Sequence, residues 1–114
     1  AEQIPARFRS NYGSALGQHY WQIAEHLKSK VFFRQFNLMN VVGLPFRKLD
    51  IIYCQNVLIY FKKFDRRDIL NALVKCLDIG GILVLGPGEV LEWRHPQLKK
   101  IVWSGTLAYE KVCI

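Results

Sequence analysis

The spacing of hydrophobic and polar positions changes along the chain. Residues 49–54 and 82–85 are nearly continuous apolar runs, which suit strands covered on both faces of a parallel sheet. Between them, apolar residues recur at helical spacing and predict one apolar helix face, made of Ile69, Leu70, Leu73, Val74 and Leu77. Asp65 fits the N-cap of this helix, and Gly80 with Gly81 fits its end. The pattern predicts a strand–helix–strand unit.

The flanking segments extend this unit. Leu16, Tyr20, Ile23 and Leu27 recur near helical spacing and predict a short helix. Residues 31–36 are rich in β-branched and aromatic side chains and predict a strand. At the other end, residues 100–103 and 107–112 predict a tight hairpin through Ser104-Gly105. We therefore expect an α/β fold whose sheet is mostly parallel, with an antiparallel C-terminal hairpin.

Composition sets limits on the class of protein. The 114 residues suit one small domain, and 51% apolar residues with 22% charged ones favour a buried core over disorder. The net charge is +7, but the basic residues are dispersed, and no pure basic run is longer than a pair. This distribution favours a solvated surface over a nucleic-acid groove. No apolar run approaches the length of a membrane span, so we expect no membrane insertion.

The cysteines and the first residues refine these limits. Cys54, Cys76 and Cys113 are far apart and odd in number, which favours buried free thiols in a reducing cytoplasm. The three histidines add no ligand-spaced pair, so a zinc site is not expected. The first ten residues lack the apolar stretch of a signal peptide. The chain also lacks an initiator Met, which suggests a processed or trimmed piece.

Candidate binding residues follow the predicted strands, because open α/β sheets bind ligands beyond the carboxyl ends of their strands. Gln55 and Asn56 are amides between two apolar runs, and they either bind a ligand or cap the next turn. Asn37 follows a predicted strand and fits a turn residue better than a ligand contact. Tyr60 lies in an aromatic turn, where packing is favoured over a role at an active-site mouth.

The glycine-containing segment after residues 82–85 does not fit a phosphate-binding turn. Pro87 removes an amide donor, and Leu91 occupies the place of a third glycine. We therefore interpret Gly86 to Gly88 as a tight turn. Glu89 is either a ligand or base residue, or only a carboxylate at a helix start.

Residues 49–61, with the sequence LDIIYCQNVLIYF, resemble the signature of CheR-type chemotaxis receptor methyltransferases, (F)D-x-I-x-C-R-N-V-L-I-Y-F. The resemblance covers nearly the whole chain in the expected order. It includes Arg7-Phe8 for R-Y-F, residues 31–38 for V-x-F-x-x-x-N-L, residues 77–83 for L-x-P-G-G-x-L, and residues 105–111 for G-x-x-x-Y-x-(K/R).

The resemblance implies a Rossmann-like domain that binds S-adenosylmethionine and transfers its methyl group to glutamates of methyl-accepting receptors. Asn37 and Leu38 match cofactor-contacting positions after a strand. Cys54, Gln55 and Asn56 match a second cofactor-contacting loop, and Tyr60 matches a tyrosine near the methyl group. The implied partner is the cytoplasmic domain of such a receptor, and the implied location is the cytoplasm.

The chain departs from the family pattern at several points. Gln55 replaces the usual arginine, and Gly86-Pro87-Gly88-Glu89 replaces G-H-S-E, which is closer to the branch of type IV pilus and twitching-motility systems. The family's helical N-terminal domain, its glycine-rich loop and its ribose-binding acidic residue have no match here. We therefore expect residues 1–114 to be the C-terminal portion of the catalytic domain, with a sheet edge prone to dimerisation or domain swapping.

Two other functions fit the same residues. One is a Rossmann-like methyltransferase that acts on RNA or on a small molecule, which the basic charge permits. The other is a non-catalytic module that only binds partners, favoured by Gln55 and by the absent glycine-rich loop.

Overall fold

The computed structural model describes residues 12–16, 20–43, 45–88, 92–103 and 105–114. The chain divides into two compact units, Ala1–Gln35 and Phe36–Ile114, and each is described by itself. Arg7-Phe8 and Glu89 lie outside the described residues, and so does Leu91.

The first unit contains a hairpin where the sequence pattern predicts a helix. Strands β1 (Gly13–Leu16) and β2 (Tyr20–Ile23) pair antiparallel, and only a four-residue helix follows, α2 (Glu25–Lys28). The helix prediction is therefore wrong except at Leu27. The reason lies at Gly13, where any Cβ atom would lie 2.3 Å from the Trp21 indole. Glycine lets the ring cross the neighbouring strand, and this contact favours the hairpin.

Residues 31–36 form no strand, so this prediction is also wrong. Phe32 is 85% exposed and Phe33 is 95% exposed. β-Branched and aromatic residues favour strands mainly by packing against cross-strand neighbours, and the structure places no described strand beside this segment.

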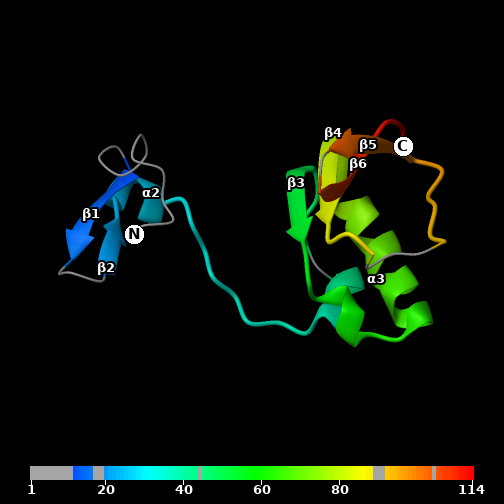
Figure 1. Ribbon diagram of the computed structural model, residues 1–114, viewed down its shortest axis with the longest axis horizontal. Coiled ribbons are helices and arrows are strands. Elements are labelled where there is room, and N and C mark those ends of the chain that lie inside the picture. The colour runs from blue at the N-terminus through cyan, green and yellow to red at the C-terminus, as the bar shows by residue number, and fades with distance from the viewer. Residues whose placement is uncertain (1–11, 17–19, 44, 89–91, 104) are drawn as a thin grey trace. The chain divides into compact units, whose positions relative to one another are not determined.

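The second unit is an α/β domain (Figure 1). It contains the 3₁₀ helices η1 (Leu38–Gly43) and η2 (Leu58–Tyr60) and the helix α3 (Lys63–Cys76). Its strands are β3 (Leu49–Cys54), β4 (Leu77–Leu85), β5 (Leu98–Trp103) and β6 (Thr106–Lys111). Their order is β3-β4-β6-β5, with β3 and β4 parallel and the other two pairs antiparallel. The α/β class and the closing hairpin are confirmed, but one of the three strand pairs described in this sheet is parallel and two are antiparallel, because the expected strand at residues 31–36 is absent from it.

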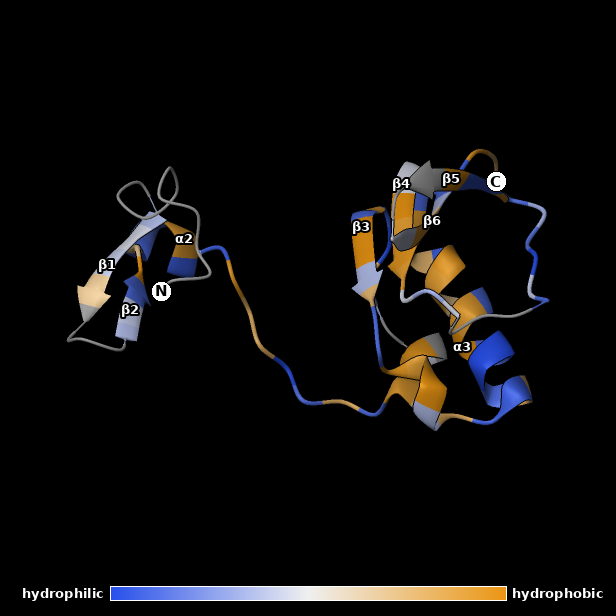
Figure 2. Cartoon of the chain, in the orientation of Figure 1, coloured by the Kyte–Doolittle hydropathy of each residue, from blue (hydrophilic) through white to orange (hydrophobic). Residues whose placement is uncertain are grey.

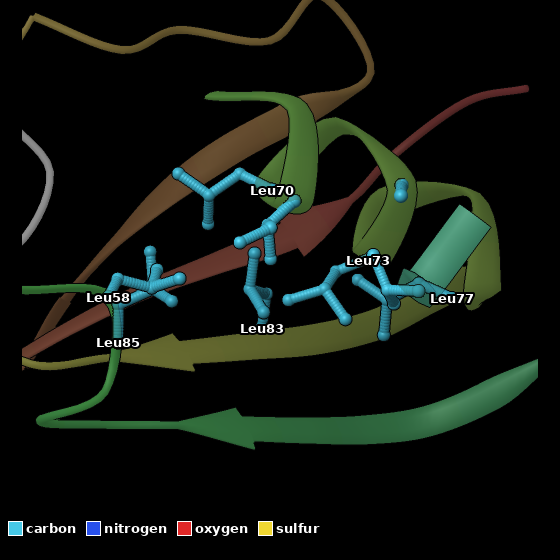
Figure 3. Close-up of a cluster of buried hydrophobic side chains, with 9 residues drawn as sticks. Leu58, Leu70, Leu73, Leu77, Leu83 and Leu85 are labelled. Atoms are coloured by element: carbon cyan, nitrogen blue, oxygen red, sulfur yellow. The ribbon is translucent and has the colours of Figure 1, made fainter. Parts of the chain in front are cut away.

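The core lies between α3 and one face of this sheet. Figure 3 shows Leu70 and Leu73 of α3 above Leu83 and Leu85 of β4, with Leu58 of η2 at one end. Leu58, Leu83 and Leu85 are fully buried. Burial of each such side chain contributes about 1.5–3 kcal/mol, so this cluster holds η2 and the ends of the strands in place.

The opposite face of β3 is open to solvent, contrary to the expectation of cover on both faces. Ile52 and Cys54 pack against the core, whereas Ile51 is 64% exposed and Tyr53 is 70% exposed. Side chains alternate along a strand, so one face of β3 is covered and the other is not. In the part of the chain that the structure describes, β3 lies at the sheet edge with β4 as its neighbour.

Helix α3 begins and ends earlier than predicted. Its N-cap position is Lys62, so Asp65 lies inside the first turn, where a carboxylate still stabilises the positive end of the helix. The helix ends at Cys76 and leads directly into β4, which contains both Gly80 and Gly81. These glycines therefore do not terminate the helix.

The helix end is stabilised instead from the far strand. The buried Lys111 of β6 donates hydrogen bonds from Nζ to the carbonyl oxygens of Val74 at 3.0 Å and Leu77 at 2.9 Å. The last carbonyls of a helix lack partners within the helix, and a cation near them also stabilises the negative end of the helix dipole. Lys111 therefore ties α3 to the sheet.

Candidate functional site

The candidate site lies where β3 and β4 end side by side. Cys54 pairs with Leu85 in the parallel ladder, so the segments after both strands leave the sheet together. Gln55 connects them, because its Nε2 donates a hydrogen bond to the Leu85 carbonyl oxygen at 3.2 Å. Its Oε1 accepts a short hydrogen bond from the Tyr53 hydroxyl. Gln55 therefore links the carboxyl ends of the two strands.

Tyr53 is a member of this site that the sequence analysis missed. Alternation along a strand places residues i and i+2 on the same side, so the spacing of Tyr53 and Gln55 contained the signal. The Tyr53 hydroxyl and the Leu85 carbonyl together fix the orientation of the Gln55 amide. One N–H of that amide is left for a further acceptor, since an amide nitrogen has two donors.

Asn56 follows in a left-handed backbone conformation, with φ of +60°. Asparagine tolerates this region better than most residues, but the conformation still costs free energy. The side chain of Asn56 is exposed. Such conformations concentrate at binding sites, and this one turns the chain from β3 toward η2.

Tyr60 ends η2 and is 81% exposed. The interpretation that this ring serves packing is therefore wrong. The buried neighbour Leu58 anchors the 3₁₀ turn in the core, and the backbone N–H of Tyr60 donates to the Val57 carbonyl at 3.2 Å. The turn thus presents the phenol to solvent at the carboxyl edge of the sheet.

Asn37 and Leu38 have different surroundings. The Asn37 Oδ1 accepts a hydrogen bond from the Met39 N–H at 3.0 Å, and its carbonyl accepts one from Asn40 N–H at 2.9 Å. This is the turn role that the residue type favours, here at the start of η1. Leu38 and Cys54 both pack against the same core cluster, partly buried. The structure therefore brings Leu38, but not the Asn37 side chain, into the packing beneath the site.

The segment after β4 is a tight turn, as predicted. Gly86 is buried, whereas Pro87 and Gly88 form an exposed turn in which Gly88 has φ of +79°. That angle lies in the left-handed region, which glycine adopts without steric cost.

A cavity of about 290 Å³ lies elsewhere in the second unit. Its lining combines residues that precede β3 with one side of α3: Val41, Arg47, Asp68, Asn71, Ala72, Lys75 and Cys76. None of the residues predicted to bind cofactor lines this cavity, among the residues that the structure describes.

Two pKa shifts occur near the closing hairpin. Burial lowers the pKa of His95, and the positive charge of Lys111 lowers it further. Consistent with a neutral ring, the His95 Nδ1 accepts a hydrogen bond from the Gln97 N–H at 3.2 Å. Burial raises the pKa of Tyr109, whose ring contacts Trp93 edge to face at 5.6 Å.

Other kinds of site find no support in the described ranges. Cys54, Cys76 and Cys113 form no disulfide there, and Cys76 is buried as expected, whereas Cys54 is only partly buried and Cys113 is exposed. Within those ranges, no cluster of histidine, cysteine, aspartate or glutamate could hold a metal ion. No helix there has the length and apolar character needed to cross a membrane.

Comparison with known proteins assigns a family. The family described as CheR methyltransferase, SAM binding domain, matches residues 1–106. A chemotaxis protein methyltransferase of Pseudomonas putida is 33% identical over 99 residues, which cover 87% of this chain and 36% of that protein. One from Pseudomonas aeruginosa is 39% identical over 80 residues, covering 70% and 29% respectively. One from Vibrio parahaemolyticus is 39% identical over 87 residues, covering 76% and 31%.

The fold and the amide-bearing strand ends define the class, an α/β domain with polar side chains at the carboxyl end of its parallel strands, where open α/β sheets bind ligands. The chain belongs to the CheR methyltransferase family, within its SAM-binding domain. S-adenosylmethionine is the cofactor of that domain, as the resemblance of residues 49–61 implied. The chain spans about a third of the length of the curated relatives it matches.

Proposed function

We propose that this chain belongs to the catalytic domain of a protein-glutamate O-methyltransferase that acts on methyl-accepting receptors. The observation that carries the proposal is the segment after the carboxyl end of β3, where Gln55, Asn56 and Tyr60 follow the strand in the family's order. The names of the relatives support chemotaxis receptors as the substrate class.

The residues at this edge fit part of a cofactor site. The exposed Asn56 amide and the remaining N–H of Gln55 supply donors and acceptors for the polar groups of a nucleoside. Leu38 and Cys54 supply partly buried apolar surface beneath them. We propose that these residues hold one side of S-adenosylmethionine, and that Asn37 acts by shaping the turn before η1.

Methyl transfer from a sulfonium to a carboxylate requires mainly that the protein positions the two reactants. When bound, S-adenosylmethionine supplies an electrophilic methyl group on a sulfonium. A glutamate carboxylate is already ionised near neutral pH, so no strong base is required. The tasks left for the protein are to align the two reactants and to exclude water. We propose that Tyr60 meets the carboxylate or the methyl group, and its exposed ring in the turn that follows Asn56 supports this role.

We further propose that residues 1–114 form the C-terminal portion of the catalytic domain. The order of the motifs and the open face of β3 at Ile51 and Tyr53 support this assignment. We expect the 114-residue chain alone to bind S-adenosylmethionine weakly or not at all. Calorimetric titration tests this, and micromolar binding by the chain would contradict it.

The activity test uses the complete gene product that contains this chain. It is incubated with S-adenosylmethionine labelled at the methyl group, with receptor cytoplasmic domains in one arm and RNA in the other. We expect label on the receptor that alkali releases as methanol, because glutamate methyl esters hydrolyse in base. Label on RNA would support the rival methyltransferase, and label on neither would support the non-catalytic module.

Three finer proposals follow from the same assignment. We propose a cytoplasmic location, where receptor signalling domains lie. Gln55 and Gly86-Pro87-Gly88 favour the pilus branch, which methylation of a pilus-system receptor in preference to a chemotaxis receptor would test. The open edge of β3 favours pairing with another chain through dimerisation or domain swapping. Light scattering that finds only monomer at high concentration would contradict this last proposal.

A further inference from the structure

A cluster of basic and aromatic side chains extends from η2 into the first turns of α3. Tyr60 is 81% exposed and Phe64 is 67% exposed. Lys62, Lys63 and Arg67 are exposed as well. We call these five residues the basic platform. Exposed aromatic rings beside arginine are the residue types that dominate binding energy at protein interfaces.

Part of the platform is pre-organised. The Arg67 guanidinium carbon lies 5.1 Å from the centre of the Phe64 ring, and its Nη2 lies 3.1 Å from the Asp68 carboxylate. These contacts favour one orientation of the guanidinium, so less side-chain conformational entropy is lost when a partner binds it. Lys63 pairs with Glu92 at 3.7 Å, and both side chains are largely exposed. Such a pair is weak, so Lys63 can exchange Glu92 for a carboxylate of a partner.

The charge of this region selects the partner. Residues 62–68 contain four basic residues against two acidic ones, within a chain of net charge +7. The N-terminus of α3 adds the positive end of a helix dipole. Figure 2 shows these first turns of α3 as hydrophilic and the later turns as hydrophobic. The platform therefore complements an acidic surface.

We infer that the basic platform docks an acidic helical stretch of the protein substrate. Tyr60 belongs both to the platform and to the candidate site, so a helix docked here brings its glutamates to the carboxyl end of β3. The identity of the occupant rests on the proposed function. Binding of such a helix does not require methyl transfer, so docking at the basic platform and the proposed methyltransferase function can be refuted separately.

The test measures binding of a labelled helical peptide with glutamates at i, i+3 and i+4 spacing to the 114-residue chain, by fluorescence anisotropy. The Lys62→Glu/Lys63→Glu variant is expected to raise Kd by about tenfold at low salt, since it turns two attractions into repulsions. Phe64→Ala is expected to raise Kd about threefold, because Arg67 loses its stacking partner. Both sites are exposed, and circular dichroism verifies that the variants fold.

The matched control is Lys99→Glu/Lys100→Glu, which makes the same charge change at an exposed lysine pair on β5. We expect it to raise Kd by less than about twofold. Equal loss in both double variants, or equal binding of a peptide with glutamine for glutamate, would overturn the inference. So would tighter binding of a single-stranded RNA that the platform variant abolishes. Peptide binding without receptor methylation would leave the platform standing and overturn only the proposed function.

Discussion

The buried Lys111 gives a sharp test of how the second unit is held together. Substitution Lys111→Met keeps the side-chain length and apolar stem but removes the ammonium that bonds the carbonyls of Val74 and Leu77. Hydrogen bonds from a charged donor contribute about 1.5–3 kcal/mol each. Removing the buried charge also removes its desolvation cost, which offsets roughly half of that sum. We therefore expect the free energy of unfolding to fall by about 1.5–3 kcal/mol.

Urea unfolding followed by far-UV circular dichroism measures this change, because α3 is the longest helix that the structure describes. In a separate thermal scan the melting temperature should fall by about 6–24 °C, at the 4–8 °C per kcal/mol expected for a domain of 60–100 residues. The control is Lys75→Met, which makes the same substitution at an exposed position in the last turn of α3. We expect this control to stay within about 0.5 kcal/mol of the parent chain. Equal stability of the two variants would refute the argument that Lys111 holds the helix end.

Three further predictions concern the backbone and pH. Gly81→Ala places a Cβ 2.8 Å from two backbone oxygens and should cost about 1–3 kcal/mol by urea unfolding, whereas Gly43→Ala meets no atom within 4 Å. Asn56→Gly should keep stability while Asn56→Ala loses about 1 kcal/mol, yet both should weaken S-adenosylmethionine binding by the complete gene product if the amide contacts it. The lowered pKa of His95 means that neutral His95 stabilises the fold above about pH 6.5, and that this stability is lost as pH falls through the lowered pKa. His95→Gln should flatten that acid-side loss in urea titrations, and an unchanged pH dependence of stability would contradict this role of His95.

The parts of the fold that the sequence predicted are those with local causes. The apolar face of α3 depends on the helical period, and Leu70 and Leu73 are buried where that period places them. The closing hairpin depends on Gly105, whose φ of +70° suits the tight turn between β5 and β6. Both features are encoded within a few residues of where they occur.

The parts that sequence analysis missed depend on distant neighbours. Lys111, far along the chain, bonds the carbonyls at the end of α3, and the helix ends at Cys76, before the predicted stop at Gly80 and Gly81. Residues 31–36 have the composition of a strand but no described strand beside them. Composition records a preference for pairing, but only the partner decides whether the pairing forms.

The candidate site also combines features with local causes and features that depend on distant residues. Gln55 and Asn56 were found from their place after a strand, and the structure adds why they hold their positions: the Tyr53 and Leu85 contacts for one and a left-handed backbone for the other. Tyr60 was predicted to pack and is exposed, because Leu58 fills the core position of that turn instead. The family resemblance, not the residue pattern, gave Tyr60 its proposed role.

The open face of β3 connects the fold to the proposed function. The sequence of β3 suits burial on both faces, yet Ile51 and Tyr53 remain about two-thirds exposed, and covering the rest of both side chains would stabilise the fold by about 2–4 kcal/mol. If the rest of the proposed catalytic domain covers these side chains, we expect the covering surface to form the other side of the proposed cofactor site. Hydrogen exchange of the β3 amides should then slow in the complete gene product relative to the 114-residue chain, and cofactor binding should appear with that protection. Slow exchange of the β3 amides in the 114-residue chain alone would contradict this assignment of the domain. Cofactor binding without protection of the β3 amides would contradict it as well.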